Sequence, residues 1–123
     1  RCQRMSNRII QMKSDKREKS VADLAYFLRD EINADMIFGK PCQIGGGDVA
    51  LLCFERMYFR NGSYASLTVM LTDDGEIQTA DIIGYGGGEG LMNFSWGANR
   101  NFAEMAEGVL RKQGFQTYAA QKV

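Results

Sequence analysis

The chain has no histidine, one proline and three cysteines among its 123 residues. Without histidine it cannot hold a Ser-His-Asp triad, a histidine-ligated zinc ion or the usual general base of neutral pH. Cys2, Cys42 and Cys53 are scattered and form no CxxC pair, which predicts free thiols and argues against a structural zinc site. We therefore expect no metal, no cofactor and no disulfide.

The chain also lacks a long apolar run and a net charge. No stretch reaches the roughly 18 apolar residues of a membrane-spanning helix, and basic and acidic side chains balance. These absences predict a protein that binds neither a membrane nor nucleic acid. Residues 1–19 nevertheless hold seven basic side chains against two acidic ones, so we expect 1–7 to form a flexible basic arm. The free thiols indicate a reducing, cytoplasmic compartment.

The residues that are present predict one ordinary globular domain over 1–123, with 116–123 as a tail. An apolar fraction of 45% and a charged fraction of 24% are average for globular proteins, and no linker divides the chain. A chain of this length can bury a core without disulfide or metal staples.

Two stretches have the pattern of amphipathic helices. Ser20 to Asp23 and Asn101 to Glu104 each resemble a capping box, and each opens an apolar stripe with helical spacing. The patterns predict helices over 20–33 and 101–113, the second ending at Gly114 with Phe115 folded back on the last turn. The stripes consist of Val21, Leu24, Ala25, Leu28 and Ile32, and of Phe102, Met105, Ala106, Val109 and Leu110.

Between the helices lie three β-favouring stretches, 49–60, 64–73 and 76–85. Asn61-Gly62 and Asp74-Gly75 separate them, and such pairs favour tight hairpins, so we expect an antiparallel meander. Short strands over 7–13, 36–38 and 91–96 would extend it, and 45–48 would be a loop. Pro41 would either confine the second of these strands to an edge of the sheet or end it. The predicted fold class is therefore α+β. Four to five strands would carry two helices on one face, as in TATA-binding-protein-like and helix-grip domains.

Two-residue turns would fix which side chains share a face of this sheet. The face that the helices should cover holds most of the large apolar residues, and also Arg56 and Tyr58. The opposite face is mixed, and its apolar members predict contact with a second copy, another protein or a ligand. An ordinary tolerant surface is the alternative. These interface candidates are Cys53, Met57, Met70, Ile77 and Ile83.

The same register would place Glu55, Thr68 and Asp81 in one row across three strands. Two carboxylates beside a hydroxyl could hold a cation or act as an acid–base pair. Strands two apart are too widely spaced for one ion, so solvated carboxylates that protect the sheet from aggregation are the simpler interpretation.

A second candidate site would lie around Arg56. An arginine on an apolar face extends past the sheet edge to solvent, pairs with a carboxylate such as Asp23 or Glu107, or holds an anionic ligand. The glycine-rich stretch Gly86–Gly88 lacks the lysine of a phosphate-binding loop but could form a lip beside such a ligand. The ligand-binding candidates are Arg56, Tyr58, Gly87, Trp96 and Arg100.

Several stretches together resemble one known family. They are Phe54-Glu55-Arg56-Met57-Tyr58, Ser66-Leu67-Thr68-Val69-Met70-Leu71, Gly86 to Gly88 and the closing helix with Phe102 and Glu104. Over roughly residues 8–116 the chain is similar to domain of unknown function 6054, a set of small bacterial proteins. The resemblance implies a cytoplasmic bacterial protein and assigns no activity.

Two functional hypotheses follow. The first is a non-catalytic binding or assembly module that works through the open sheet face or a cleft between sheet and helices. The second is a small enzyme or carrier that binds an anionic metabolite near Arg56, Trp96 and the Gly86–Gly88 lip. The lack of a catalytic constellation favours the first.

Overall fold

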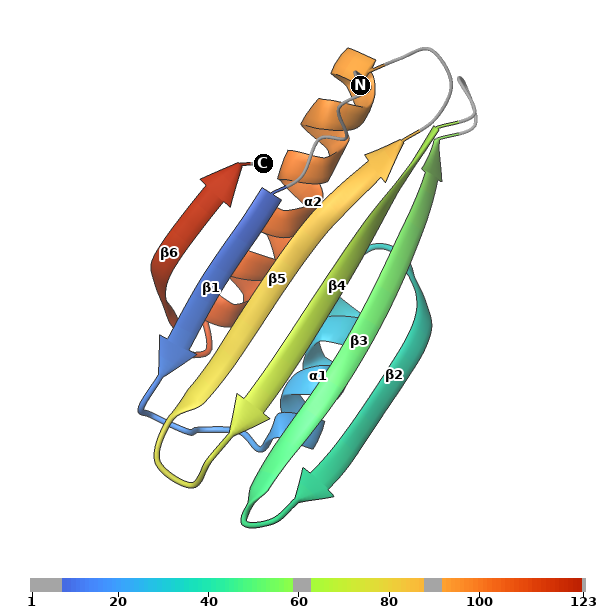
Figure 1. The fold of residues 1–123 in the computed structure, drawn as a ribbon. Coiled ribbons are helices and arrows are strands. Elements are labelled where there is room, and N and C mark those ends of the chain that lie inside the picture. The colour runs from blue at the N-terminus through green and yellow to red at the C-terminus, as the bar shows by residue number, and fades with distance from the viewer. Residues whose placement is uncertain (1–7, 59–62, 88–91, 123) are drawn as a thin grey trace.

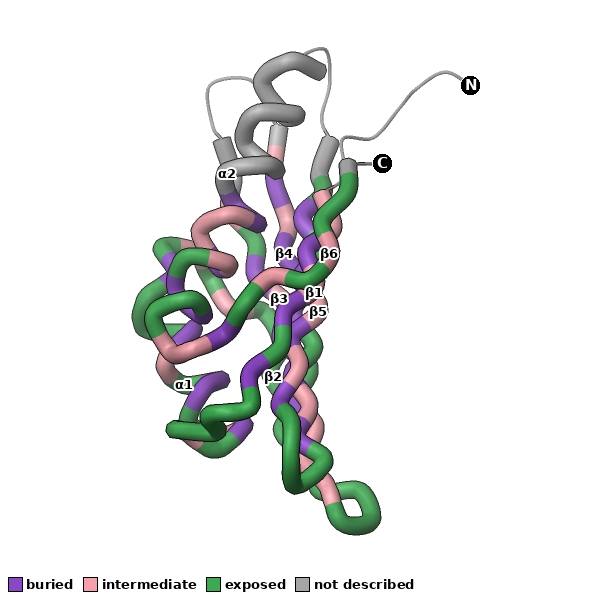
Figure 2. The backbone as a smooth tube through the Cα atoms, turned by 90° about the vertical axis from the view of Figure 1, so that its left-hand side faces the viewer, coloured by how far each residue is buried: buried purple, intermediate pink, exposed green. Residues whose placement is uncertain are grey.

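The computed structural model describes residues 8–58, 63–87 and 92–122, and it shows an α+β fold built on one antiparallel sheet (Figure 1). Six strands lie in the order β2-β3-β4-β5-β1-β6, where four to five were expected. Both helices pack on one face of this sheet (Figures 1 and 2). The elements are β1 (Arg8–Ser14), α1 (Val21–Glu31), β2 (Asp35–Ile44), β3 (Gly47–Tyr58), β4 (Ser63–Asp73), β5 (Gln78–Gly87), α2 (Met92–Arg111) and β6 (Gln116–Lys122).

The helix α1 begins and ends close to the predicted residues. The Ser20 side chain accepts a hydrogen bond from the Asp23 N–H at 3.1 Å, as an N-cap should. At the other end the Ile32 N–H bonds to the Leu28 carbonyl, and Ile32 itself is buried.

The helix α2 differs from the prediction at its start. It runs from Met92, so the expected strand over 91–96 is wrong, and the predicted capping box lies inside the helix. A short apolar run cannot be assigned to strand or helix by periodicity alone, and residues 92–101 contain no proline or β-branched residue to oppose a helix. The end is as predicted, because Gly114 has φ 92° and the Phe115 N–H bonds to the Leu110 carbonyl at 3.1 Å.

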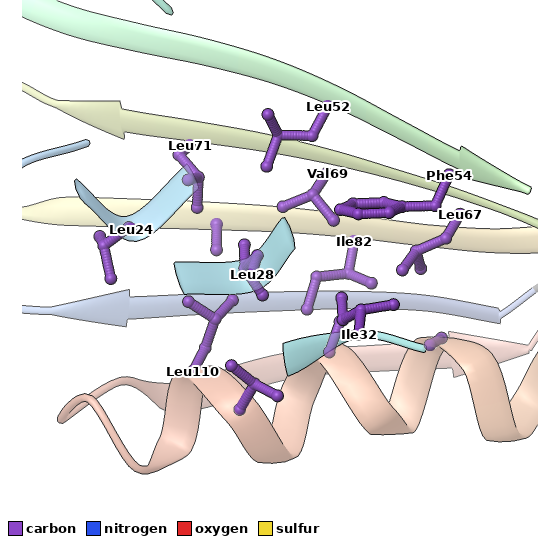
Figure 3. Close-up of a cluster of buried hydrophobic side chains, with 14 of the residues drawn as sticks. Leu24, Leu28, Ile32, Leu52, Phe54, Leu67, Val69, Leu71, Ile82 and Leu110 are labelled. Atoms are coloured by element: carbon purple, nitrogen blue, oxygen red, sulfur yellow. The ribbon is translucent and has the colours of Figure 1, made fainter. Parts of the chain in front are cut away.

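The hydrophobic core lies between the sheet and the two helices (Figure 3). Side chains of α1 and α2, including Leu24, Leu28 and Leu110, point toward those of the central strands. The sheet contributes alternate residues, as the two-residue period of a strand requires. They include Leu52, Phe54, Leu67, Val69, Leu71, Ala80 and Ile82.

The strand register is shifted by two residues from the predicted one. Arg56 pairs with Ala65 and Thr68 with Ile83, so the β4–β5 loop has four residues rather than two. The Asp74 side chain explains this length, because its carboxylate accepts the N–H groups of Glu76 and Ile77, both at 2.9 Å. A shift of two leaves every side chain on its predicted face. The Asn61-Gly62 turn lies outside the described residues.

The two edges of the sheet depart most from the prediction. The strand β2 has ten residues instead of three and contains Pro41, which an edge strand tolerates. Residues 116–122, expected as a tail, form β6 and pair with β1 on the other edge. Within the described ranges, no helix is long and apolar enough to cross a membrane.

Candidate functional site

The face of the sheet opposite the helices is the most distinctive surface of the described chain. Figure 2 shows the helices on one side of the sheet only. We call the other side the open face; it carries the odd-numbered residues of β1, β3 and β5 and the even-numbered residues of β4. Large hydrophobic side chains are exposed there on the four neighbouring strands β2, β3, β4 and β5 and on β6. They are Phe38, Leu51, Met70, Ile83, Tyr85 and Tyr118.

Three of the five predicted interface residues gather at the middle of the open face. Cys53, Thr68 and Ile83 form one row across β3, β4 and β5, and Met70 lies in the next row. The exposed fractions of Met70 and Ile83 are 39% and 38%, and the Cys53 Sγ lies 4.0 Å from the Thr68 hydroxyl.

The other two interface candidates lie toward the ends of the strands. Ile77 is in the four-residue loop between β4 and β5 rather than in a strand, although its side chain is also exposed. Met57 pairs with Tyr64 near the end of β3, and its side chain lies outside the described ones.

A shallow hollow lies on the open face toward the β3–β4 loop. Its volume of about 320 Å³ is at the lower end for small-molecule sites. The lining contains one carboxylate, Glu55, two phenol rings and no basic side chain. The lining residues are Ile37, Cys53, Phe54, Glu55, Tyr64, Ser66, Leu67, Thr68 and Tyr85. An aromatic and acidic hollow attracts cationic groups rather than anionic ones.

The predicted row of Glu55, Thr68 and Asp81 does not form. Because of the register shift, Glu55 lies opposite Ser66, while Asp81 lies opposite Met70 and accepts a hydrogen bond from Gln11 at 2.9 Å. Among the described residues, no group of three or more cysteine, aspartate or glutamate side chains could hold a metal ion.

Arg56 lies on the helix side of the sheet, as predicted, but with different partners. Its guanidinium donates to the backbone carbonyl of Asn33 at 2.6 and 3.1 Å and lies 5.3 Å from the centre of the Phe102 ring. The expected pairing with Asp23 or Glu107 is therefore wrong: the Glu107 carboxylate accepts from Arg111 and from Thr117. Arg56 thus ties the end of α1 to α2.

The remaining ligand-binding candidates belong to one end of the molecule. Tyr58 pairs with Ser63, and Gly87 pairs with Tyr64, at the ends of β3 and β5. Trp96 and Arg100 belong to the first half of α2, which reaches the same end in Figure 1. Their side chains lie outside the described ones, so the anionic-ligand site remains a prediction.

One cluster of functional groups was missed from the sequence. The Asp73 side chain, 7% exposed, accepts hydrogen bonds from the Gly75 N–H at 2.8 Å, from Arg17 Nε and from Gln78 Nε2. Burial opposes ionisation of this carboxyl, but the hydrogen bonds and the Arg17 charge outweigh it and lower the pKa of Asp73. The Asp73-Asp74-Gly75 turn was a visible signal, but nothing local pointed to Arg17.

The family of the chain can now be stated. The model of a family described as "Family of unknown function (DUF6054)" matches residues 10–114. The chain belongs to this family. The DUF6054 match confirms the resemblance seen in the sequence, and it runs from β1 through α2, ending before β6. No curated protein and no solved structure matches the chain.

Proposed function

We propose that this DUF6054 protein is a non-catalytic assembly module that binds a protein partner through its open sheet face. The observation that carries the proposal is the band of exposed hydrophobic side chains across that face, from Phe38 on β2 to Tyr118 on β6. Contiguous exposed apolar patches on globular proteins commonly mark interaction sites. The proposal includes a bacterial, cytoplasmic protein with a TATA-binding-protein-like or helix-grip-like arrangement.

The size of the face supports this proposal. Six strands about 4.8 Å apart, each of 7–12 residues with a rise of about 3.3 Å, cover roughly 25 Å by 30 Å. The resulting area of about 750 Å² is close to the roughly 800 Å² that each partner contributes to an ordinary interface.

The chemistry of the described residues favours assembly over a site for an anionic metabolite. Arg56, the basic group of such a site, already donates to Asn33 and stacks on Phe102. The hollow on the open face holds a carboxylate and two phenols but no basic residue, so it does not suit an anion.

Sedimentation of purified protein tests the proposed function. Met70→Asp places a charge at the middle of the open face, where the 39% exposed side chain leaves room for it in the free chain. We expect the wild type to associate at micromolar concentrations and the variant to associate at least about 10-fold more weakly, with an unchanged circular dichroism spectrum.

Tyr26→Asp is the matched control, because Tyr26 is an exposed aromatic residue on α1, away from the open face. It should associate like the wild type. Association of Met70→Asp as strong as that of the wild type would contradict assembly through the open face.

A further inference from the structure

Opposite charges occupy two diagonal corners of the open face. Asp35 and Glu55 are paired across β2 and β3 toward one end of the strands, and both are exposed. Lys13 is exposed on β1 toward the other end, in the row of Thr79, Thr72 and Val49. We call these the acidic corner and the basic corner.

The centre of the diagonal between these corners holds two large apolar side chains. Glu55 and Lys13 are separated by three inter-strand steps and six residues along a strand, about 14 Å by 20 Å. The midpoint lies between β4 and β5, next to Met70 and Ile83 and to their neighbours Asp81 and Thr68. The Asp81 carboxylate is already paired within its own chain, because it accepts a hydrogen bond from Gln11. Large apolar side chains at the centre with charged groups toward the rim are the usual anatomy of a protein interface.

This arrangement is self-complementary. From it, and resting on the proposed assembly function, we infer that the partner on the open face is a second copy of this chain. The two faces pack crosswise about a two-fold axis, and Lys13 of each copy enters the acidic hollow of the other beside Glu55. The axis that exchanges the two corners passes close to Met70 and Ile83, so each of these residues meets its own counterpart.

The hollow suits a lysine side chain. Glu55 supplies the opposite charge, and the Tyr64 and Tyr85 rings supply aromatic surface for the ammonium group. Lys13 already has such a contact within its own chain, since its Nζ lies 5.2 Å from the centre of the Tyr118 ring. Binding in the hollow would exchange one ring contact for two rings and a carboxylate.

The crosswise geometry is one that twisted sheets adopt. The two-fold axis that brings the acidic corner of one copy against the basic corner of the other makes the strands of the two copies cross at about 70°. This angle is near the orthogonal class of sheet packing. A second copy also fits the charge of the face better than nucleic acid does, because the face presents carboxylates as well as lysines.

Charge reversal tests this inference. Lys13→Glu and Glu55→Lys each place like charges together in the crosswise dimer, and we expect each to weaken dimerisation at least about 10-fold. The double variant Lys13→Glu with Glu55→Lys restores opposite charges and should return the dissociation constant to within about 3-fold of the wild type. Glu31→Lys and Lys112→Glu, exposed on the helix side, make the same charge changes and should have no effect.

The outcomes separate the arrangement from the proposed function. Single variants that dimerise like the wild type, or a double variant that does not recover, would overturn the crosswise pairing; the assembly function then stands if Met70→Asp still disrupts association. A monomeric wild type would overturn the second copy as the partner and leave the assembly function to a different protein.

A cross-linking readout covers the case in which a charge variant folds poorly. A bis-maleimide reagent with a span of about 10 Å should join Lys13→Cys to the native Cys53 of the second copy, because Cys53 lines the hollow that receives residue 13 and facing sheets pack about 10 Å apart, too far for a disulfide. Glu31→Cys, on the helix side, should give no cross-link to Cys53. Mass spectrometry identifies the cross-link, and its absence in Lys13→Cys would count against the arrangement.

Discussion

Single side chains join the loops and helices of this fold to one another. Asp73 joins the β4–β5 loop to the segment between β1 and α1, through Gly75 on one side and Arg17 on the other. Gln78 bridges the same two parts, because its amide donates both to Asp73 and to the Lys19 carbonyl. Arg56 links the two helices, because it contacts the Asn33 carbonyl after α1 and the Phe102 ring in α2. These links connect residues far apart in sequence, so no local pattern could predict them.

Removing the Asp73 carboxylate should destabilise the chain and change its acid sensitivity. Asp73→Ala leaves buried donors unsatisfied, and we expect a loss of about 2 kcal/mol in unfolding free energy at neutral pH. Since the folded pKa is lowered, the carboxylate contributes its full stability above its unfolded pKa, about 4, and loses it as pH falls through the lower folded value.

Urea unfolding at several pH values measures this effect. The difference in unfolding free energy between the wild type and Asp73→Asn, which removes the charge but keeps an acceptor oxygen, should become smaller below pH 4. Asp30→Asn, at an exposed position of α1, is the control and should follow the wild type. A gap independent of pH would show that the charge of Asp73 contributes nothing.

At the level of helices and strands, the spacing of apolar residues and the residues in the turns decided what the sequence could predict. The stripe from Val21 to Ile32 and the alternation along β3, β4 and β5 located one helix and a three-stranded meander, and the two-residue period preserved the faces despite the wrong register. The two edge strands were predicted too short, in the case of β2, or not at all, in the case of β6. No described side chain of β6 is buried, and nearly all of β2 is exposed, so neither strand shows the alternation that marks a half-buried strand.

The candidate site was likewise predictable where local alternation determines it and not where long-range pairing does. Cys53, Met70 and Ile83 were predicted to share a face because the alternation of side chains along each strand alone places them there. The acidic and basic corners were not foreseen, since β1 and β2 join the sheet through long-range pairings that the meander does not determine.

The β2–β3 hairpin offers a test at this scale. A Cβ on Gly47 would lie 2.7 Å from the backbone carbonyl oxygen of Asp73, closer than real contacts allow, while a Cβ on the neighbouring Gly46 meets nothing within 4 Å. Gly47→Ala must therefore push β3 away from β4, and we expect a loss of about 1–3 kcal/mol. Gly46→Ala should be close to neutral. Thermal unfolding of both variants measures the difference, and equal melting temperatures would contradict this close approach.

For the whole molecule, one consequence of the fold is that the two sides of the sheet have different roles. The helix side holds the single described core cluster, so the chain can fold without a partner. The open face contributes nothing to that core, and its apolar side chains are free to bind. Folding and assembly should therefore be separable by mutation.

The dependence of the melting temperature on protein concentration reveals whether folding and assembly are separate. A ligand that binds only the folded state raises the stability of that state, and in a homodimer the ligand is the chain itself. We expect the wild-type melting temperature to rise by several degrees between about 1 and 100 µM, since a 100-fold change in concentration corresponds to about 2.7 kcal/mol at saturation. Met70→Asp should melt at one temperature throughout this range, near the low-concentration value of the wild type, because the core beneath the sheet is intact. A variant that melts far below that value would show that Met70 stabilises the fold itself, and a wild type without concentration dependence would show that its open face stays free.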